Sequence, residues 1–186
     1  SKKEKKGDKY YFVYSFDVLK SGDSTAFLKS IMDRNGNTLT CEYNNNERKL
    51  TKVTNQEGRY LTFNYYTDGP GKNLIKEVVD PITRTVKFEY DSDNNLIKFI
   101  DAKGNPTSYS YDPNARYDHL LTRINLPRGN FIENAFSGRK IISQKTDNGA
   151  NTSIQYFSSY TKITDENFKS TELYYSSPVA GLLTRL

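Results

Sequence analysis

The sequence predicts an all-β protein built from tandem antiparallel β-hairpins. Its 186 residues include 15 Tyr and 10 Phe but no Trp, and tyrosine, threonine and asparagine are typical of half-exposed strands and their turns. Apolar residues alternate with polar ones, as where Val86, Phe88 and Tyr90 alternate with Lys87 and Glu89. A turn signal recurs about every 22 residues, which indicates a repeat architecture.

The clearest repeat unit runs from Asp80 to Asp101. It opens with a turn at 80–83, continues as an alternating strand that ends at Tyr90, turns again over 91–95 and returns along 96–100. Two such strands joined by a short polar turn predict one β-hairpin. The next unit opens in the same way at Asp101.

Each unit opens with a turn, and in most units a glycine follows three residues after the opening. In a D-x-x-G turn the Asp or Asn side chain can accept a backbone N–H, and glycine can adopt positive φ. The predicted turn openings are Asp33, Asn55, Asp80, Asp101, Leu126, Thr146 and Asp165; the glycines are Gly36, Gly58, Gly104, Gly129 and Gly149, with Thr83 and Phe168 in the two other units.

An aromatic residue stands seven residues beyond each glycine position. Because residues two and four positions earlier are mostly apolar and share its strand face, we expect these aromatic residues to form a structural ladder on one face. The ladder comprises Tyr43, Tyr65, Tyr90, Tyr111, Phe136, Tyr156 and Tyr175, and an aspartate follows in two units as Asp91 and Asp112.

The return strands are equally regular. Each begins with Leu, Ile or Tyr, as at Leu50 and Leu121, and a second apolar residue usually follows three positions later, as at Val53 and Ile124. A spacing of three places the two side chains on opposite faces of a regular strand. Either both faces are partly covered or a β-bulge re-aims one of the side chains.

The repeat frame also predicts the domain organisation. Residues 1–32 form a degraded or truncated N-terminal repeat, and residues 33–186 hold about seven hairpin repeats. The last residues, 183–186, match the return strand 50–53, so we expect the array to continue beyond the C-terminus.

Charge and apolar patterning exclude several classes of partner. The net charge of +5 is spread along the chain beyond its basic start, without a basic helix or an RNA-binding signature, so no nucleic acid is expected. There is no apolar run long enough for a transmembrane helix, and membrane insertion is not expected.

Candidate reactive residues lack the partners that chemistry requires. His119 is the only histidine, so no Ser-His-Asp or Cys-His arrangement with a second histidine is available. A zinc site would need several ligands that the chain lacks. The stretch 91–95 resembles the start of a calcium loop but lacks the later Gly and Glu. Cys41 has no cysteine partner and is interpreted as a small, buried residue. We therefore predict no catalytic, metal-binding or cofactor-binding residues and no enzyme activity.

Several segments resemble the Rhs or YD-repeat family: DRNGNTLTCEYN, NQEGRYLTFNYY, TVKFEYDSDNNLIKFIDAKGNPTSYSYD and HLLTRINLPRGN. The resemblance covers nearly the whole chain. It implies a ribbon of β-hairpins that spirals into a hollow shell, of which this chain is a fragment. Family members occur in bacterial polymorphic toxins and wall-associated proteins, in insecticidal toxin complexes and in teneurins. Residues 177–182 lack the aspartate of the family's self-cleavage motif, so self-cleavage is not expected.

The resemblance implies a structural function in bacteria, secreted or at the cell surface. The expected partners are the remaining repeats and a C-terminal toxin segment of the same parent chain, which the shell encloses or presents. The alternative is an adhesion module in which exposed Tyr and Phe bind carbohydrate or protein. Exposure of the aromatic rings distinguishes the two hypotheses.

Overall fold

The computed structural model describes residues 2–5, 8–11, 13–17, 25–44, 46–114, 118–175 and 183–185. These residues form strands and turns and contain no α-helix. The all-β prediction is therefore confirmed. Within the same residues, no helix is long and apolar enough to span a membrane.

The chain divides into two compact units, and strand β9 (Thr85–Tyr90) crosses the boundary between Phe88 and Glu89. The first unit comprises Ser1–Phe88 and Asp101–Gly104. Its strands are β1 (Lys2–Lys5), β2 (Asp8–Tyr11), β3 (Val13–Asp17), β4 (Phe27–Met32), β5 (Thr38–Asn44), β6 (Lys49–Asn55), β7 (Tyr60–Tyr65), β8 (Ile75–Val79) and the first part of β9. Among the described residues, strands β1 and β2 pair only with each other, whereas β3 to β9 pair antiparallel in chain order.

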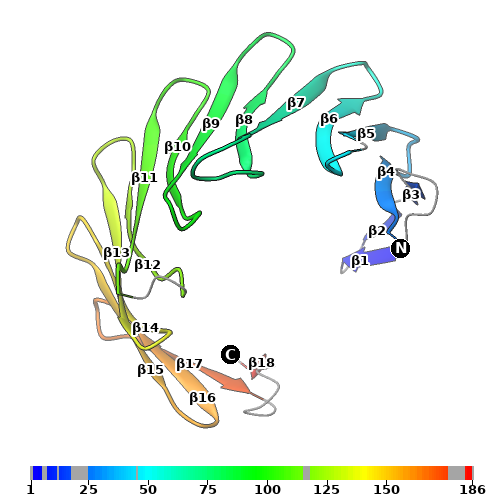
Figure 1. Ribbon diagram of the computed structural model, residues 1–186. Helices are drawn as coiled ribbons and strands as arrows, with labels where there is room; N and C mark the ends of the chain where they lie inside the picture. Colours follow the sequence, from blue (N-terminus) through cyan, green and yellow to red (C-terminus); the bar gives the residue numbers. More distant parts are fainter. Residues whose placement is uncertain are drawn as a thin grey trace. The chain divides into compact units, whose positions relative to one another are not determined.

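The second unit comprises Glu89–Ile100 and Asn105–Leu186. Its strands are β10 (Leu96–Ile100), β11 (Pro106–Tyr111), β12 (Leu121–Asn125), β13 (Phe131–Ser137), β14 (Lys140–Thr146), β15 (Asn151–Tyr156), β16 (Tyr160–Thr164), β17 (Ser170–Tyr175) and β18 (Leu183–Arg185). These strands also pair antiparallel in chain order, and the hairpins can be followed in Figure 1. The prediction that sequence neighbours pair as a meander is confirmed within each unit.

Two kinds of strand pair alternate along the chain. Strands joined by a glycine turn share only three residue pairs, as Lys52 to Thr54 of β6 do with β7. Strands joined at the other end share more pairs in most hairpins, such as six between β5 and β6, whereas the described residues of β17 and β18 share two. Each strand therefore continues beyond the region where it pairs with its glycine-turn neighbour.

The described residues contain no fully buried apolar side chain. Most strand residues are half-buried, and the buried polar residues are Asn95 and Thr161, which are 8% and 5% exposed. An ordinary domain packs a sheet against a second layer to bury its apolar face. Here the apolar face is covered only in part, by contacts within and between hairpins.

Candidate functional site

The glycine turns are closed by their opening residue. Asp33 Oδ1 accepts hydrogen bonds from the backbone N–H groups of Asn35 at 2.8 Å and Asn37 at 3.0 Å, while Gly36 adopts a φ of 85°. The side-chain hydrogen bond from Asn37 is the largest influence on the pKa of Asp33 and lowers it. The side chains of the openings Asn55, Asp80, Asp101 and Asp165 accept backbone N–H groups in the same manner.

Turns whose first residue has no carboxylate or amide side chain keep the same backbone geometry. The N–H of Gly129 donates to the carbonyl of Leu126 at 3.0 Å, and the N–H of Gly149 donates to that of Thr146 at 3.0 Å. In the second case the neighbouring Asn148 accepts the backbone N–H of Ala150 at 3.0 Å, replacing the missing Asp oxygen. The sequence frame therefore describes a backbone shape that more than one side chain can stabilise.

The two units without glycine adopt the left-handed conformation all the same. Thr83 has a φ of 65° and Phe168 a φ of 60° at the glycine position. The left-handed conformation costs a residue with a Cβ about 1–2 kcal/mol. Phe168 is also 88% exposed, so packing of its ring does not offset the strain.

A β-bulge accounts for the spacing of three in the return strands. In the hairpin β5–β6, Glu42 pairs with Lys52 but Tyr43 pairs with Leu50, so Thr51 is the extra residue. The same register shift occurs next to Phe16, Tyr65, Tyr111, Phe136 and Tyr175. Because the extra residue reverses the alternation, Leu50 and Val53 lie on one face with Tyr43. The bulge alternative is thus correct for these hairpins, whereas β15–β16 pairs from Ser153 to Tyr156 without a register shift.

Four ladder tyrosines make the same hydrogen bond across a strand boundary. Each hydroxyl donates to the backbone carbonyl of the residue 15 positions earlier, which is the first or second residue of the preceding return strand. The pairs are Tyr43 to Leu28 at 2.9 Å, Tyr65 to Leu50 at 2.8 Å, Tyr111 to Leu96 at 3.0 Å and Tyr156 to Ile141 at 2.9 Å. Burial raises the pKa of Tyr43, Tyr65 and Tyr111.

The accepting carbonyl lies beyond the end of the backbone pairing. Strands β6 and β7 pair only from Lys52 to Thr54, so the carbonyl of Leu50 has no backbone donor on the β7 side. The hydroxyl of Tyr65 reaches across the diverging strands and satisfies it. Each ladder tyrosine of this kind therefore fastens its hairpin to the preceding one.

Two ladder positions, Phe136 and Tyr175, differ from this arrangement. Phe136 has no hydroxyl, and the Asn134 amide on the same face donates to the carbonyl of Leu121 at 2.9 Å instead. Tyr175 hydrogen-bonds to the side chain of Thr161, because β16 and β17 pair over five residues and leave no diverging end. Tyr90 ends β9 and is half-buried.

The Tyr-Asp turn at 91–95 repeats the geometry of the glycine turns. Asp91 Oδ1 accepts the N–H groups of Asp93 and Asn95, each at 2.9 Å, and Oδ2 accepts the Asn95 side chain at 2.9 Å. Desolvation acts to raise the pKa of Asp91, but these hydrogen bonds together lower it. Asp112 Oδ1 likewise accepts the N–H of Asn114 at 2.9 Å. Both carboxylates thus stabilise their own turns.

His119 connects two hairpin tips. It is exposed, has a φ of 50°, and its Nδ1 contacts the side-chain oxygen of the buried Asn95. A similar contact 24 residues apart joins Lys49 Nζ to Asn73 Oδ1 at 2.9 Å in the first unit. The histidine therefore contributes to a contact between two hairpin tips. Within the described residues, no three His, Cys, Asp or Glu side chains form a group that could hold a metal ion.

The strand face opposite the ladder carries cross-strand polar pairs. The pair just before the bulge is Glu42 with Lys52 in β5–β6, whose charged groups lie 3.5 Å apart. In β7–β8 the corresponding residues are Asn64 and Glu77, joined by a hydrogen bond of 3.0 Å. Long polar side chains thus cover this part of the backbone.

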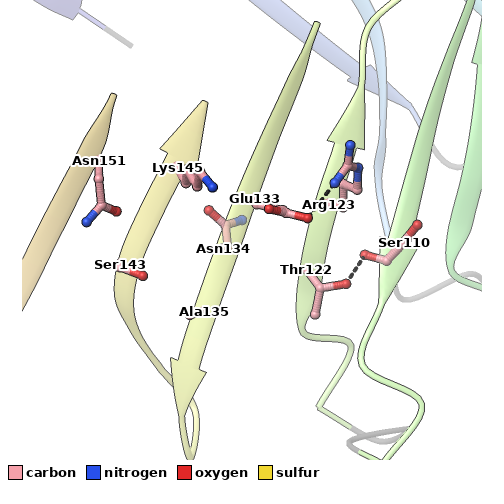
Figure 2. Close-up of a pocket in the computed structure, with 9 residues that line it drawn as sticks. All are labelled: Ser110, Thr122, Arg123, Glu133, Asn134, Ala135, Ser143, Lys145 and Asn151. Carbon is pink, nitrogen blue, oxygen red and sulfur yellow. Dashed lines mark hydrogen bonds and ion pairs between the residues drawn. The ribbon is translucent and has the colours of Figure 1, made fainter. Parts of the chain in front are cut away.

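In β13–β14 the same position is occupied by Ala135 and Ser143. Their short side chains leave a depression of about 660 Å³, which extends over β11–β15 and is shown in Figure 2. Its other lining residues are Ser110, Thr122, Arg123, Glu133, Lys145 and Asn151, together with Asn134. The depression lies entirely within the second unit.

The charged groups of the depression differ in how they are paired. Arg123 forms an ion pair with Glu133, donates to Asn125 Oδ1 at 2.8 Å and lies 3.9 Å from the centroid of the Phe131 ring. Lys145 faces Glu133 and Asn151 in the strand register, but among the described residues it forms no ion pair. Its ammonium group therefore remains available in the depression.

Some aromatic rings near the end of the second unit remain open. Tyr156 is 40% exposed and Phe157 is 46% exposed. The Phe157 ring stacks on that of Tyr160 with centroids 4.4 Å apart, and Tyr160 stacks on Tyr174 at 5.3 Å. Other exposed rings are Tyr14, Phe16, Tyr60 and Phe168, which lie in separate strands and turns. The hydroxyl of Tyr156 is bonded to the backbone, as are those of Tyr43, Tyr65 and Tyr111.

Cys41 is half-buried beside Tyr43, and burial raises the pKa of its thiol. A thiol in this state is a poor nucleophile. Sequence reasoning missed the depression. Ala135 and Ser143 stand where β5–β6 and β7–β8 carry long polar side chains, but β3–β4 has Ser15 and Ser30 at the same position, so short residues there do not by themselves signal a depression.

The chain resembles the crystal structure of TcdB2-TccC3-Cdc42 with 11% identity and a TM-score of 0.38, covering 90% of this chain and 10% of that chain. The Photorhabdus luminescens Tc holotoxin pore gives 11% identity and a TM-score of 0.36, again covering 90% and 10%. The chain thus spans about a tenth of the length of these toxin chains.

No curated protein sequence matches the chain. The family model of the Teneurin YD-shell matches residues 2–177. This range contains all the glycine turns and all the ladder residues described above. The chain therefore belongs to the Teneurin YD-shell family.

Proposed function

We propose that this chain is a non-catalytic structural segment of a YD-repeat shell. In the parent protein its hairpins contribute to a wall that encloses a C-terminal toxin segment of the same chain. We place the parent protein outside the bacterial cytoplasm, secreted or at the cell surface. This localisation rests on the resemblance to secreted and surface-located family members.

The recurrent tyrosine hydrogen bond carries the proposal. Four hydroxyls each satisfy the carbonyl of the preceding return strand, 15 residues earlier. Such a bond holds neighbouring hairpins together where their backbone pairing ends. A wall of hairpins needs such a bond at every repeat, whereas catalysis does not require it.

The polar groups of the turns support a structural role as well. The carboxylates of Asp33, Asp80, Asp91 and Asp165 accept backbone N–H groups of their own turns. An acid, a base and a nucleophile have to converge for most catalysis. These aspartates instead lie in separate turns and are hydrogen-bonded there.

Containment can be tested by limited proteolysis of the purified parent protein. The C-terminal segment should be digested much more slowly in the intact protein than when it is produced alone. Tyr65→Ala combined with Tyr111→Ala should accelerate its digestion, because two fastenings between hairpins are lost. Equal digestion rates for the enclosed and the isolated segment would contradict containment.

The absence of catalysis is a separate test. The purified 186-residue chain should give no turnover above buffer with peptide, glycoside, phosphoester or nucleic-acid substrates. Turnover that a single Asp or Glu substitution abolishes, with the fold intact by circular dichroism, would show that the scaffold hypothesis is wrong.

A further inference from the structure

The chain contains two Asn-Gly sequences, and both stand at the same place in a glycine turn. Asn35 precedes Gly36, and Asn148 precedes Gly149, each as the third and fourth residues of the turn. All four residues are exposed. Asparagine is chemically labile, and a following glycine has no Cβ that would keep its backbone nitrogen away from the asparagine side chain. In both turns the glycine nitrogen can therefore approach the side-chain carbon of the asparagine.

The backbones of the two turns are alike. Gly36 and Gly149 have φ values of 85° and 88°. The Gly36 N–H donates to the Asp33 carbonyl at 3.2 Å, and the Gly149 N–H donates to the Thr146 carbonyl at 3.0 Å. Each glycine nitrogen has to leave this hydrogen bond before it can react. The backbone therefore hinders the reaction to a similar degree in both turns.

The two asparagine side chains differ in their hydrogen bonds. In the first turn Asp33 Oδ1 accepts the backbone N–H of Asn37 at 3.0 Å, and the Asn35 side chain has no hydrogen-bond partner among the described residues. In the second turn Asn148 Oδ1 accepts two hydrogen bonds, from the Thr146 hydroxyl and, at 3.0 Å, from the backbone N–H two residues later. The Asn148 side chain is thus held in place, whereas that of Asn35 can rotate toward the glycine nitrogen.

We propose that Asn35 is a site of spontaneous deamidation, with water as the only co-reactant. The Gly36 nitrogen forms a bond to the side-chain carbon of Asn35, and the side-chain nitrogen leaves as ammonia together with the proton of the Gly36 amide. Water then opens the resulting cyclic succinimide at either carbonyl, which gives aspartate or isoaspartate. The new carboxylate lowers the formal net charge of +5 by one. The reaction does not depend on the proposed function of the chain.

Two other asparagines in the same turn position should react more slowly. The Asn148 side chain has to leave two hydrogen bonds first, which corresponds to a rate about tenfold lower. Asn167 has no side-chain partner within the part of the chain that the structure describes, but it precedes Phe168, whose Cβ hinders ring closure. The three asparagines thus separate the effect of side-chain hydrogen bonds from that of the following residue.

Deamidation at Asn35 loosens the connection between β4 and β5. These strands share only three residue pairs, which join 30–32 to 38–40. Isoaspartate adds a methylene group to the main chain inside the turn, and the new carboxylate lies two residues from that of Asp33, which repels it. The backbone amide hydrogens of 38–40 should therefore exchange faster with solvent in the deamidated chain.

The test is incubation of the purified 186-residue chain in mildly alkaline, heavy-oxygen water, followed by peptide mapping with mass spectrometry. Asn35 should convert about tenfold faster than Asn148, and its product should carry one heavy oxygen atom. The variant Asn35→Gln should lack the acidic form of the chain that appears first. Hydrogen exchange of that acidic form, separated by ion exchange, measures the loosening of β4–β5.

Exchange of the opening residues tests why the two rates differ. Thr146→Asp supplies the carboxylate that accepts a backbone N–H in the first turn, so Asn148 is released and should react about tenfold faster. Asp33→Thr should slow Asn35, because its side chain can then accept the N–H of Asn37 as Asn148 does in its own turn. In each variant the asparagine of the unaltered turn is the control for folding and should keep its rate.

Equal conversion rates of Asn35 and Asn148 in the unaltered chain would overturn the proposal. So would an absence of conversion at Asn35, or opening-residue variants in which neither asparagine changes its rate. Unchanged hydrogen exchange at 38–40 after deamidation would overturn the inferred loosening of β4–β5.

Discussion

Hairpins β5–β6 and β13–β14 have the same backbone pairing but carry different side chains on their two faces. Both pair over six residues with a bulge before the ladder residue. On the ladder face, Tyr43 satisfies one carbonyl in the first hairpin, and Asn134 satisfies the equivalent carbonyl in the second because Phe136 has no hydroxyl. On the other face, Glu42 and Lys52 are replaced by Ala135 and Ser143.

The difference teaches that the two faces are under different physical constraints. A carbonyl at the diverging end of two strands has to be hydrogen-bonded, so a lost tyrosine hydroxyl is compensated by a nearby amide. An exposed ion pair contributes only about 0–1 kcal/mol, so its loss needs no compensation. The ladder face therefore preserves a function with varying residues, whereas the polar face can be altered to create a new surface.

The largest expected effect tests whether the ladder face holds the hairpins together. Tyr111→Ala removes a half-buried ring and the hydrogen bond to Leu96. We expect the free energy of unfolding in urea to fall by about 2 kcal/mol, below the ~3–5 kcal/mol of fully buried aromatic residues. Tyr111→Phe should lose only about 1 kcal/mol, since the ring remains. Equal losses for the two variants would show that ring packing contributes nothing.

A double-mutant cycle in β13–β14 sharpens the comparison. Asn134→Leu removes the donor to the Leu121 carbonyl and should lower the free energy of unfolding by about 1 kcal/mol. Adding Phe136→Tyr should restore most of this loss, because the new hydroxyl would lie 15 residues after Leu121, as in the other units. If the two substitutions are simply additive, the amide does not replace the hydroxyl.

The glycine turns that follow the two hairpins provide the next test. Gly58 and Gly149 have φ values of 79° and 88°, whereas Phe168 occupies the same turn position at 60°. Phe168→Gly should raise the free energy of unfolding by about 0.5–1 kcal/mol, as relief of left-handed strain exceeds the entropy cost of glycine.

Gly149→Ala is the control for the strain argument. A Cβ at this position meets nothing within 4 Å, so any destabilisation comes from the backbone conformation alone. A thermal midpoint that falls for Phe168→Gly, or that rises for Gly149→Ala, would contradict the argument.

The smallest expected effect concerns the stability of the fold at acidic pH. The lowered pKa of Asp33 means that its turn contributes stability above the unfolded value of about 3.9, and this contribution is lost as the pH falls through the lower folded pKa. Asp33→Asn should flatten the stability profile below about pH 4, because an amide oxygen can accept the same N–H groups as it does at Asn55. Asp68→Asn, outside the glycine turns, serves as the control. Identical profiles for both variants and the parent would show that Asp33 does not couple to folding.

The sequence by itself determined the fold class and the order in which the hairpins pair. These follow from local chemistry: alternation sets the strand, and an Asp or Asn side chain with a left-handed residue three positions later sets the turn. The frame even located Phe168, whose backbone is left-handed despite its side chain.

Only the tertiary structure decided how neighbouring hairpins are connected. The choice between a bulge and two covered faces at Leu50 and Val53 depends on the register against Tyr43 in another strand. The hydroxyl bond and its replacement by Asn134 depend on where the backbone pairing of two strands ends. The depression at Ala135 and Ser143 likewise needs both residues opposite each other. Residues distant in sequence become neighbours only through pairing, and a one-residue change in register moves a side chain to the other face.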